Sequence, residues 1–188
     1  NVWFYPARDL LFYHADIKGA FLTGKRMEVL RAIVEKKGRE AITVVTTMDA
    51  FLDGLPSKEE LYGNRIKIHA EEALDFQKLQ ENLSILGYER ENQVESPGQF
   101  AVRGGILDVF PLTEENPVRI ELWGDEVDSI RSFDVESQRS TENLQEIEIY
   151  PATENWKQME TESFLAYFPV KETILFLDEP VRLQESAE

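Results

Sequence analysis

The chain contains no cysteine, which excludes disulfide bonds, thiolate metal sites and cysteine nucleophiles. No apolar run approaches the roughly 18 residues that a membrane-spanning helix requires. No basic segment precedes the short apolar stretch Val2–Tyr5, so a signal peptide is not expected. The two histidines, His14 and His69, lie too far apart for metal-ligand spacing. We therefore expect a cytoplasmic chain without a membrane segment, a metal site or a cofactor.

Basic residues are in the minority: 20 lysines and arginines stand against 36 acidic residues, for a net charge of −16. Duplex DNA repels such a surface unless basic groups are concentrated locally. The densest basic cluster is Lys36, Lys37 and Arg39, at the end of a predicted helix, where interaction with the helix dipole accounts for it. A protein partner is therefore expected rather than direct DNA contact.

Strand-like and helix-like segments alternate at the start of the chain. Val2–Tyr5 predicts a strand, and Lys25–Lys37 predicts an amphipathic helix with Thr23 as its N-cap. The β-branched run Ala41–Thr46 predicts a buried parallel strand, and Met48–Leu55 predicts a short helix. This order is typical of an α/β domain with a parallel sheet.

The pattern then changes twice. Arg65–His69 predicts an edge strand, Asp75–Leu86 predicts a helix, and short strands with tight turns follow as far as Tyr150. After Pro151 a helical pattern returns around Glu160–Phe168, and Thr173–Leu177 predicts another buried strand. The simplest organisation is an α/β domain interrupted by a smaller α+β domain.

Arginine is the only basic residue type between Glu89 and Asp134. Alternation along Val118–Trp123 directs one set of side chains to the core and leaves Arg119, Glu121 and Trp123 on the other face. The inward set is Val118, Ile120 and Leu122; in the preceding strand Phe100 and Val102 point inward and Arg103 outward. Such a face suits protein recognition, because arginine and aromatic residues are enriched at interfaces. An ordinary solvated face with internal Arg–Glu pairs is equally compatible with the periodicity.

Two segments partly match nucleotide-binding motifs. Gly19–Arg26 approaches the phosphate-binding loop, but Arg26 replaces the hydroxyl residue that would hold Mg²⁺, so a turn before the following helix is the favoured interpretation. The apolar run ending in Asp178 and Glu179 matches the acidic motif of NTPases, a weak signal without a phosphate cradle.

Three long blocks carry a family resemblance: GQFAVRGGILDVFPL, NPVRIELWGDEVDSIRSFDVESQRS and IEIYPATE. They resemble the N-terminal region of the bacterial transcription-repair coupling factors (the Mfd family), and the arginine-bearing pattern is similar to that of the excision-repair protein UvrB. The resemblance implies a degenerate parallel-sheet α/β domain, like the first helicase domain of UvrB, made of residues 1–58 and 147–188. It implies that residues 59–146 form an inserted UvrA-binding α+β domain with an antiparallel sheet.

The resemblance also implies a function. The segment would be a non-enzymatic module that recruits UvrA to RNA polymerase stalled at DNA lesions, because the Walker A motif would lie before residue 1. RNA polymerase and DNA would be bound by other domains of an ATP-dependent translocase. The implied UvrA contacts are Arg90, Arg103, Arg119 and Glu121, with Leu122 or Trp123 as apolar neighbours, and Asp178 and Glu179 would be a Walker B-like relic. Ala101 stands where UvrB carries a further arginine.

Two alternatives remain open. The segment could be an NTPase fragment that binds nucleotide through Gly19–Lys25 and Asp178–Glu179. It could also act as an autoinhibitory clamp whose arginine-bearing face contacts the motor domains of the full-length protein.

Overall fold

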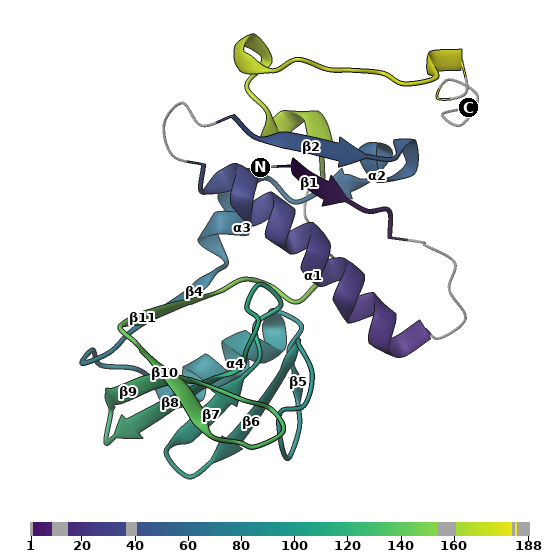
Figure 1. Cartoon of the computed structure of the whole chain (residues 1–188). Helices are drawn as coiled ribbons and strands as arrows, with labels where there is room; N and C mark the ends of the chain where they lie inside the picture. The colour runs from purple at the N-terminus through teal and green to yellow at the C-terminus, as the bar shows by residue number, and fades with distance from the viewer. Residues whose placement is uncertain (1, 9–14, 37–40, 154–160, 182, 184–188) are drawn as a thin grey trace. The chain divides into compact units, whose positions relative to one another are not determined.

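The computed structural model describes residues 2–8, 15–36, 41–153, 161–181 and 183 (Figure 1). It divides into two compact units, the first formed by Asn1–Tyr62 with Glu154–Glu188 and the second by Gly63–Thr153. The architecture is mixed α/β, with three two-stranded sheets and one six-stranded sheet among the described residues. The domain limits implied by the resemblance stay a prediction.

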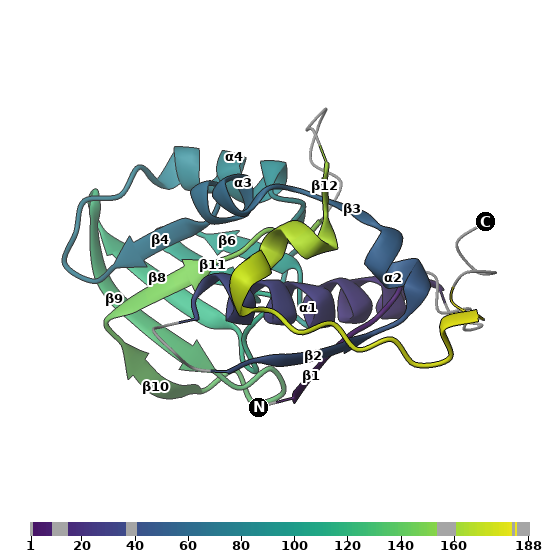
Figure 2. The same ribbon diagram turned by 90° about the horizontal axis from the view of Figure 1, so that it is seen from above.

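A parallel strand pair and one long helix form the body of the first unit. Strand β1 (Val2–Tyr5) pairs in parallel with β2 (Thr43–Thr46), and α1 (Ala15–Val34) runs alongside them (Figure 2). Met27, Leu30 and Ile33 of α1 are buried at helical spacing. Within the described residues, no helix combines the length and apolar character needed to cross a membrane.

Helix α1 begins ten residues before its predicted start at Lys25, and Thr23 lies inside it rather than at its N-cap. No proline interrupts Ala15–Val34, and burial of the apolar face outweighs the cost of about 1 kcal/mol for each of its two interior glycines. The segment Gly19–Lys25 is therefore helical. Both interpretations of it, the phosphate-binding loop and the turn, are wrong, because helical backbone N–H groups are bonded within the helix.

Short elements complete the first unit. Helix α2 (Met48–Leu52) has Thr47 as its N-cap, with the Ala50 N–H donating to the hydroxyl at 3.3 Å. Helix α3 (Lys58–Gly63) follows a capping box in which the Ser57 and Glu60 side chains each accept the other's backbone N–H. Beyond these lie β3 (Gly54–Leu55), which pairs with β12 (Glu162–Ser163), and the 3₁₀ turns η1 (Phe164–Tyr167) and η2 (Val170–Glu172). The described part of the helix predicted around Glu160–Phe168 is thus strand β12 followed by a single 3₁₀ turn.

Burial was predicted for two apolar segments of the first unit, of which β2 is only partly buried and Thr173–Leu177 is largely exposed. Val45 of β2 is 52% exposed, and Thr173–Leu177 forms no strand, with Ile174 79% and Phe176 86% exposed. An extended run is buried only when other elements cover both of its faces, and no described element pairs with Thr173–Leu177. The strand prediction is therefore wrong for Thr173–Leu177, whereas the predicted parallel strand is present as β2.

The second unit is built on a six-stranded sheet ordered β10–β9–β8–β7–β6–β5. Neighbours are antiparallel except β5 and β6, so the sheet is mixed rather than purely antiparallel as expected. Its strands are β5 (Glu89–Arg90), β6 (Gln99–Arg103), β7 (Ile106–Val109), β8 (Val118–Trp123), β9 (Glu126–Phe133) and β10 (Ser140–Leu144). The unit also holds β4 (Ile66–His69), paired with β11 (Glu146–Ile149), and α4 (Phe76–Ile85).

Helix α4 and strand β4 cover one face of this sheet. Leu79 and Leu83 of α4 and Ile68 of β4 pack against inward side chains of the sheet, including Leu107 and Ile120. Two tight turns with left-handed glycines, Gly104 (φ 61°) and Gly124 (φ 62°), join β6 to β7 and β8 to β9. The predicted helix and the inward residues of β6 and β8 are confirmed. The opposite face carries the polar side chains.

Tyr88 ties the start of the sheet to the end of the second unit. Its hydroxyl is buried and donates to the Tyr150 carbonyl at 2.8 Å. Burial raises the pKa of Tyr88, because it disfavours the phenolate. Stability is therefore unaffected by this group below pH ~10, the unfolded pKa, and falls above it, where only the unfolded chain releases the proton.

We expect the unfolding free energy of the wild-type chain to fall more steeply above pH 10 than that of Tyr88→Phe, by up to about 1.4 kcal/mol per pH unit. At neutral pH the variant should lose about 1 kcal/mol with its hydrogen bond. Urea unfolding at pH 7 and between pH 10 and 11 measures both. Parallel pH profiles for the two proteins would show that Tyr88 is not the responsible group.

Candidate protein-binding surface

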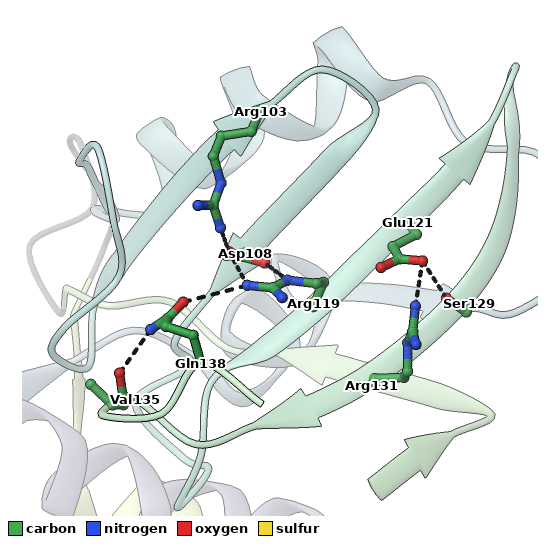
Figure 3. A network of polar contacts seen from close by, with 8 residues as sticks. All are labelled: Arg103, Asp108, Arg119, Glu121, Ser129, Arg131, Val135 and Gln138. Carbon is green, nitrogen blue, oxygen red and sulfur yellow. Dashed lines mark hydrogen bonds and ion pairs between the residues drawn. The ribbon is translucent and has the colours of Figure 1, made fainter. Parts of the chain in front are cut away.

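The side of the six-stranded sheet opposite α4 carries a row of charged side chains, here called the arginine face (Figure 3). Strand register assembles it: Asp108 of β7 lies opposite Arg119 of β8, which lies opposite Arg131 of β9. The face comprises Arg103, Asp108, Arg119, Glu121, Ser129 and Arg131. These residues lie up to 28 positions apart in the sequence. They meet because every second side chain of a strand points to the same face of the sheet.

Asp108 is the centre of the arginine face, and its side chain is only 2% exposed. Its Oδ2 accepts from Arg103 Nη2 at 2.7 Å and from Arg119 Nη2 at 2.9 Å. Its Oδ1 accepts from Arg119 Nε at 2.7 Å, so Arg119 binds it in a bidentate way. One buried carboxylate therefore holds two guanidinium groups side by side.

Arg119 is mainly internal. Its side chain is 17% exposed, and its guanidinium carbon lies 4.6 Å from the ring centroid of Phe133. Its Nη2 also lies 3.5 Å from Gln138 Oε1. The hydrogen bonds to Asp108 raise the pKa of Arg119. These contacts give Arg119 a structural role, whether or not it also contacts a partner.

Arg103 is the accessible member of the pair, with a side chain 52% exposed. Within the described residues its guanidinium makes one hydrogen bond, to Asp108. Arginine carries five N–H donors and no acceptor. Arg103 thus has several donors available for an acceptor on another molecule.

The remaining charges of the face are paired with each other. Arg131 Nη2 donates to Glu121 Oε2, and the Ser129 hydroxyl donates to the same oxygen at 3.3 Å. The internal Arg–Glu pairs that the sequence left open are therefore present. Three arginines against two carboxylates leave the face with one net positive charge on a chain whose total is −16.

The other predicted contact residues do not all join this face. Arg90 is exposed on β5 but pairs with Phe100, whose side chain is in the core. Arg90 is therefore on the core side of the sheet, whereas Arg103 is on the opposite side. Leu122 packs against the core cluster. Trp123 is 84% exposed beside the β8–β9 turn. The structure brings Arg103, Arg119 and Glu121 onto one face, with Trp123 at the end of the same strand.

Ala101 stands at the position where the sequence resemblance to UvrB implied a further arginine. It is 1% exposed and belongs to a small apolar cluster with Val94 and Phe110. An arginine side chain at this position would have to displace that cluster. The arginine face therefore ends at a closed apolar edge on this side.

Asp108 was missed from the sequence, although a signal existed. In Ile106–Val109 it alternates with the inward residues Leu107 and Val109, which puts it on the same face as the arginines. A lone acidic residue among apolar ones in a strand indicates a buried charge with a partner. Only the strand register shows that this partner is a pair of arginines.

The Walker B-like residues lie elsewhere. Asp178 and Glu179 are exposed at the end of the strandless segment Thr173–Leu177, and Glu179 has a φ of 49°. Among the described residues, no group of three or more histidine, aspartate or glutamate side chains could hold a metal ion. The acidic pair therefore has no ordered strand to present it.

Comparison with known proteins points to one family. Residues 66–155 match the model described as the UvrB interaction domain. The chain is 39% identical over 154 residues to the transcription-repair-coupling factor of Bacillus subtilis (strain 168), which covers 82% of the chain and 13% of that relative. It is 35% identical over 150 residues to the factor of the same name from Staphylococcus aureus (strain bovine RF122 / ET3-1), covering 80% of the chain and 12% of the relative. The chain thus spans about an eighth of the length of these curated relatives.

Proposed function

Because the chain belongs to the transcription-repair-coupling factors, as a region that contains their UvrB interaction domain, we propose that it is a protein-binding module whose partner is UvrA. The arginine face is the proposed contact surface. In the full-length protein, this contact would recruit excision repair to RNA polymerase stalled at a DNA lesion. RNA polymerase and DNA would be bound by other parts of an ATP-driven translocase.

The observation that carries the proposal is the half-exposed Arg103 beside the buried Asp108. An arginine that is ordered before binding loses less side-chain entropy when a partner engages it. Trp123, exposed on the same strand as Arg119 and Glu121, supplies the large apolar contact that binding hot spots favour. Both residues lie within the segment that matches the UvrB interaction domain.

We also propose that the first unit is a degenerate relative of the first helicase domain of UvrB. The parallel pairing of β1 and β2 alongside α1 supports this. The helical Gly19–Lys25 segment argues against nucleotide binding there.

The test of the proposed function is a calorimetric titration of UvrA into the chain. We expect Arg103→Ala to weaken binding by about 30-fold, the ~2 kcal/mol of an interface hot spot. Arg103 suits this test better than Arg119, because its removal leaves the bidentate Asp108 contact intact.

The matched control is Lys78→Ala. Lys78 is an exposed cation on α4, the helix that covers the opposite side of the same sheet. It should leave the affinity unchanged. Absence of UvrA binding by the wild-type chain would overturn the proposal, and equal losses in both variants would mean a general charge effect.

A further inference from the structure

We infer that Asp108 is a positioning residue for partner recognition: it holds the Arg103 guanidinium in place so that its remaining N–H groups receive a carboxylate of the partner protein. This inference rests on the proposed binding function and adds the residue that sets the geometry and the chemical group that is recognised. Asp108 itself is 2% exposed, so it acts through Arg103 rather than by touching the partner.

The first step of the argument is the shared carboxylate. Two guanidinium groups repel each other, yet Arg103 and Arg119 both donate to Asp108 Oδ2, at 2.7 and 2.9 Å. Arg119 is fixed further by its second bond to Asp108 and by the Phe133 ring. Asp108 is therefore anchored on a rigid strand by Arg119 and presents a fixed acceptor to Arg103.

The second step is what this acceptor does to Arg103. A half-exposed arginine samples many rotamers, and ordering it on binding costs side-chain entropy. The bond to Asp108 orders the side chain before the partner arrives. This hydrogen bond uses one N–H group of the planar guanidinium, and the remaining N–H groups then point in fixed directions within the same plane.

The third step identifies the partner group. Arginine offers only donors, so the recognised atom must be an acceptor, and pairs of arginine with a carboxylate are among the strongest hydrogen-bonded contacts in proteins. Phosphates of nucleic acid are disfavoured by the net charge of −16, which repels a polyanion. A single carboxylate on a protein surface matches the one net positive charge of the arginine face.

Arg103→Lys separates positioning from charge. Lysine keeps the charge but lacks the planar fork, so it cannot hold Asp108 and a second carboxylate in fixed directions. We expect Arg103→Lys to weaken the binding of purified UvrA by about 10-fold or more, because the ammonium group loses the fixed directions that the guanidinium plane gives to its donors. Arg103 is half-exposed, so this variant is expected to fold. An affinity of Arg103→Lys within about twofold of wild type would overturn the inference. The proposed function would still stand in that case if the wild-type chain binds UvrA and Arg103→Ala does not.

Asp108→Asn supplies the second measurement, with folding checked by circular dichroism. If Asp108 acts through Arg103, it should weaken UvrA binding on its own and add nothing to Arg103→Ala in the double variant. Independent, multiplying losses would overturn the inference. Where Asp108→Asn fails to fold, the Arg103→Lys titration decides alone. If the wild-type chain does not bind UvrA, the inference falls together with the proposed function.

Discussion

Arg119→Met is expected to lower the unfolding free energy of the second unit by about 3 kcal/mol. The variant removes both hydrogen bonds between Arg119 and Asp108 and leaves a carboxylate that is 2% exposed with Arg103 as its remaining partner. Removing one partner of a buried ion pair is costly because the other charge stays out of water. Arg103→Ala, at a half-exposed position, should cost no more than about 1 kcal/mol.

The double variant Asp108→Leu with Arg119→Met tests this cause directly. Replacing a buried ion pair with apolar residues is often neutral or stabilising, so the double variant should recover most of the loss caused by Arg119→Met. Urea unfolding, followed by circular dichroism, compares the wild type, Arg103→Ala, Arg119→Met and the double variant. A double variant as unstable as Arg119→Met would show that lost packing against Phe133, rather than the stranded charge, is responsible.

Arg26→Met should destabilise the first unit by a similar or larger amount, about 3–5 kcal/mol. Arg26 is 1% exposed, and its Nη1 donates to the Pro6 carbonyl at 2.7 Å and lies 3.0 Å from Asp53 Oδ2. Its guanidinium carbon also lies 4.2 Å from the Tyr5 ring centroid. One side chain thus links α1, the end of β1 and the residue that follows α2.

Lys25→Ala is the matched control for Arg26→Met. Lys25 is the adjacent residue, but its side chain is 46% exposed, pairs with Glu28 and lies 5.9 Å from the Phe21 ring centroid, so its loss should cost under about 0.5 kcal/mol. Hydrogen exchange of the α1 and β1 amides measures both variants, because a chain with two units need not unfold in one step. If Gly19–Lys25 were a phosphate-binding loop, Mg-ATP would stabilise the wild-type chain, and Lys25→Ala would abolish this stabilisation while Arg26→Met would not. We expect no such stabilisation.

Much of the second unit could be predicted from local patterns. The helical pattern of Asp75–Leu86 located α4, and period-two alternation separated Ile120 from Arg119. The first unit was harder. The start of α1 was missed because its two glycines suggested a turn, and the capping box of Ser57 and Glu60 was overlooked although it is a sequence signal.

The arginine face was only half predictable. Alternation within a strand gives the side on which a residue lies, and so Arg103 and Arg119 were found. Their common partner depends on which strands are neighbours and in which register, and this is a long-range property. The same reason places Arg90 beside Phe100 rather than with the other arginines. Contact of this face with motor domains stays a prediction.

The sequence by itself determined the family, the strand and helix periods of the second unit and the sorting of its side chains into apolar and polar faces. These follow from residue types and short-range spacing, which do not depend on long-range contacts. Only the tertiary structure decided that Asp108 joins Arg103 to Arg119, that Arg26 is buried and that Thr173–Leu177 is exposed. Pairing and burial depend on which distant segments meet, and a periodic pattern carries no information about that choice.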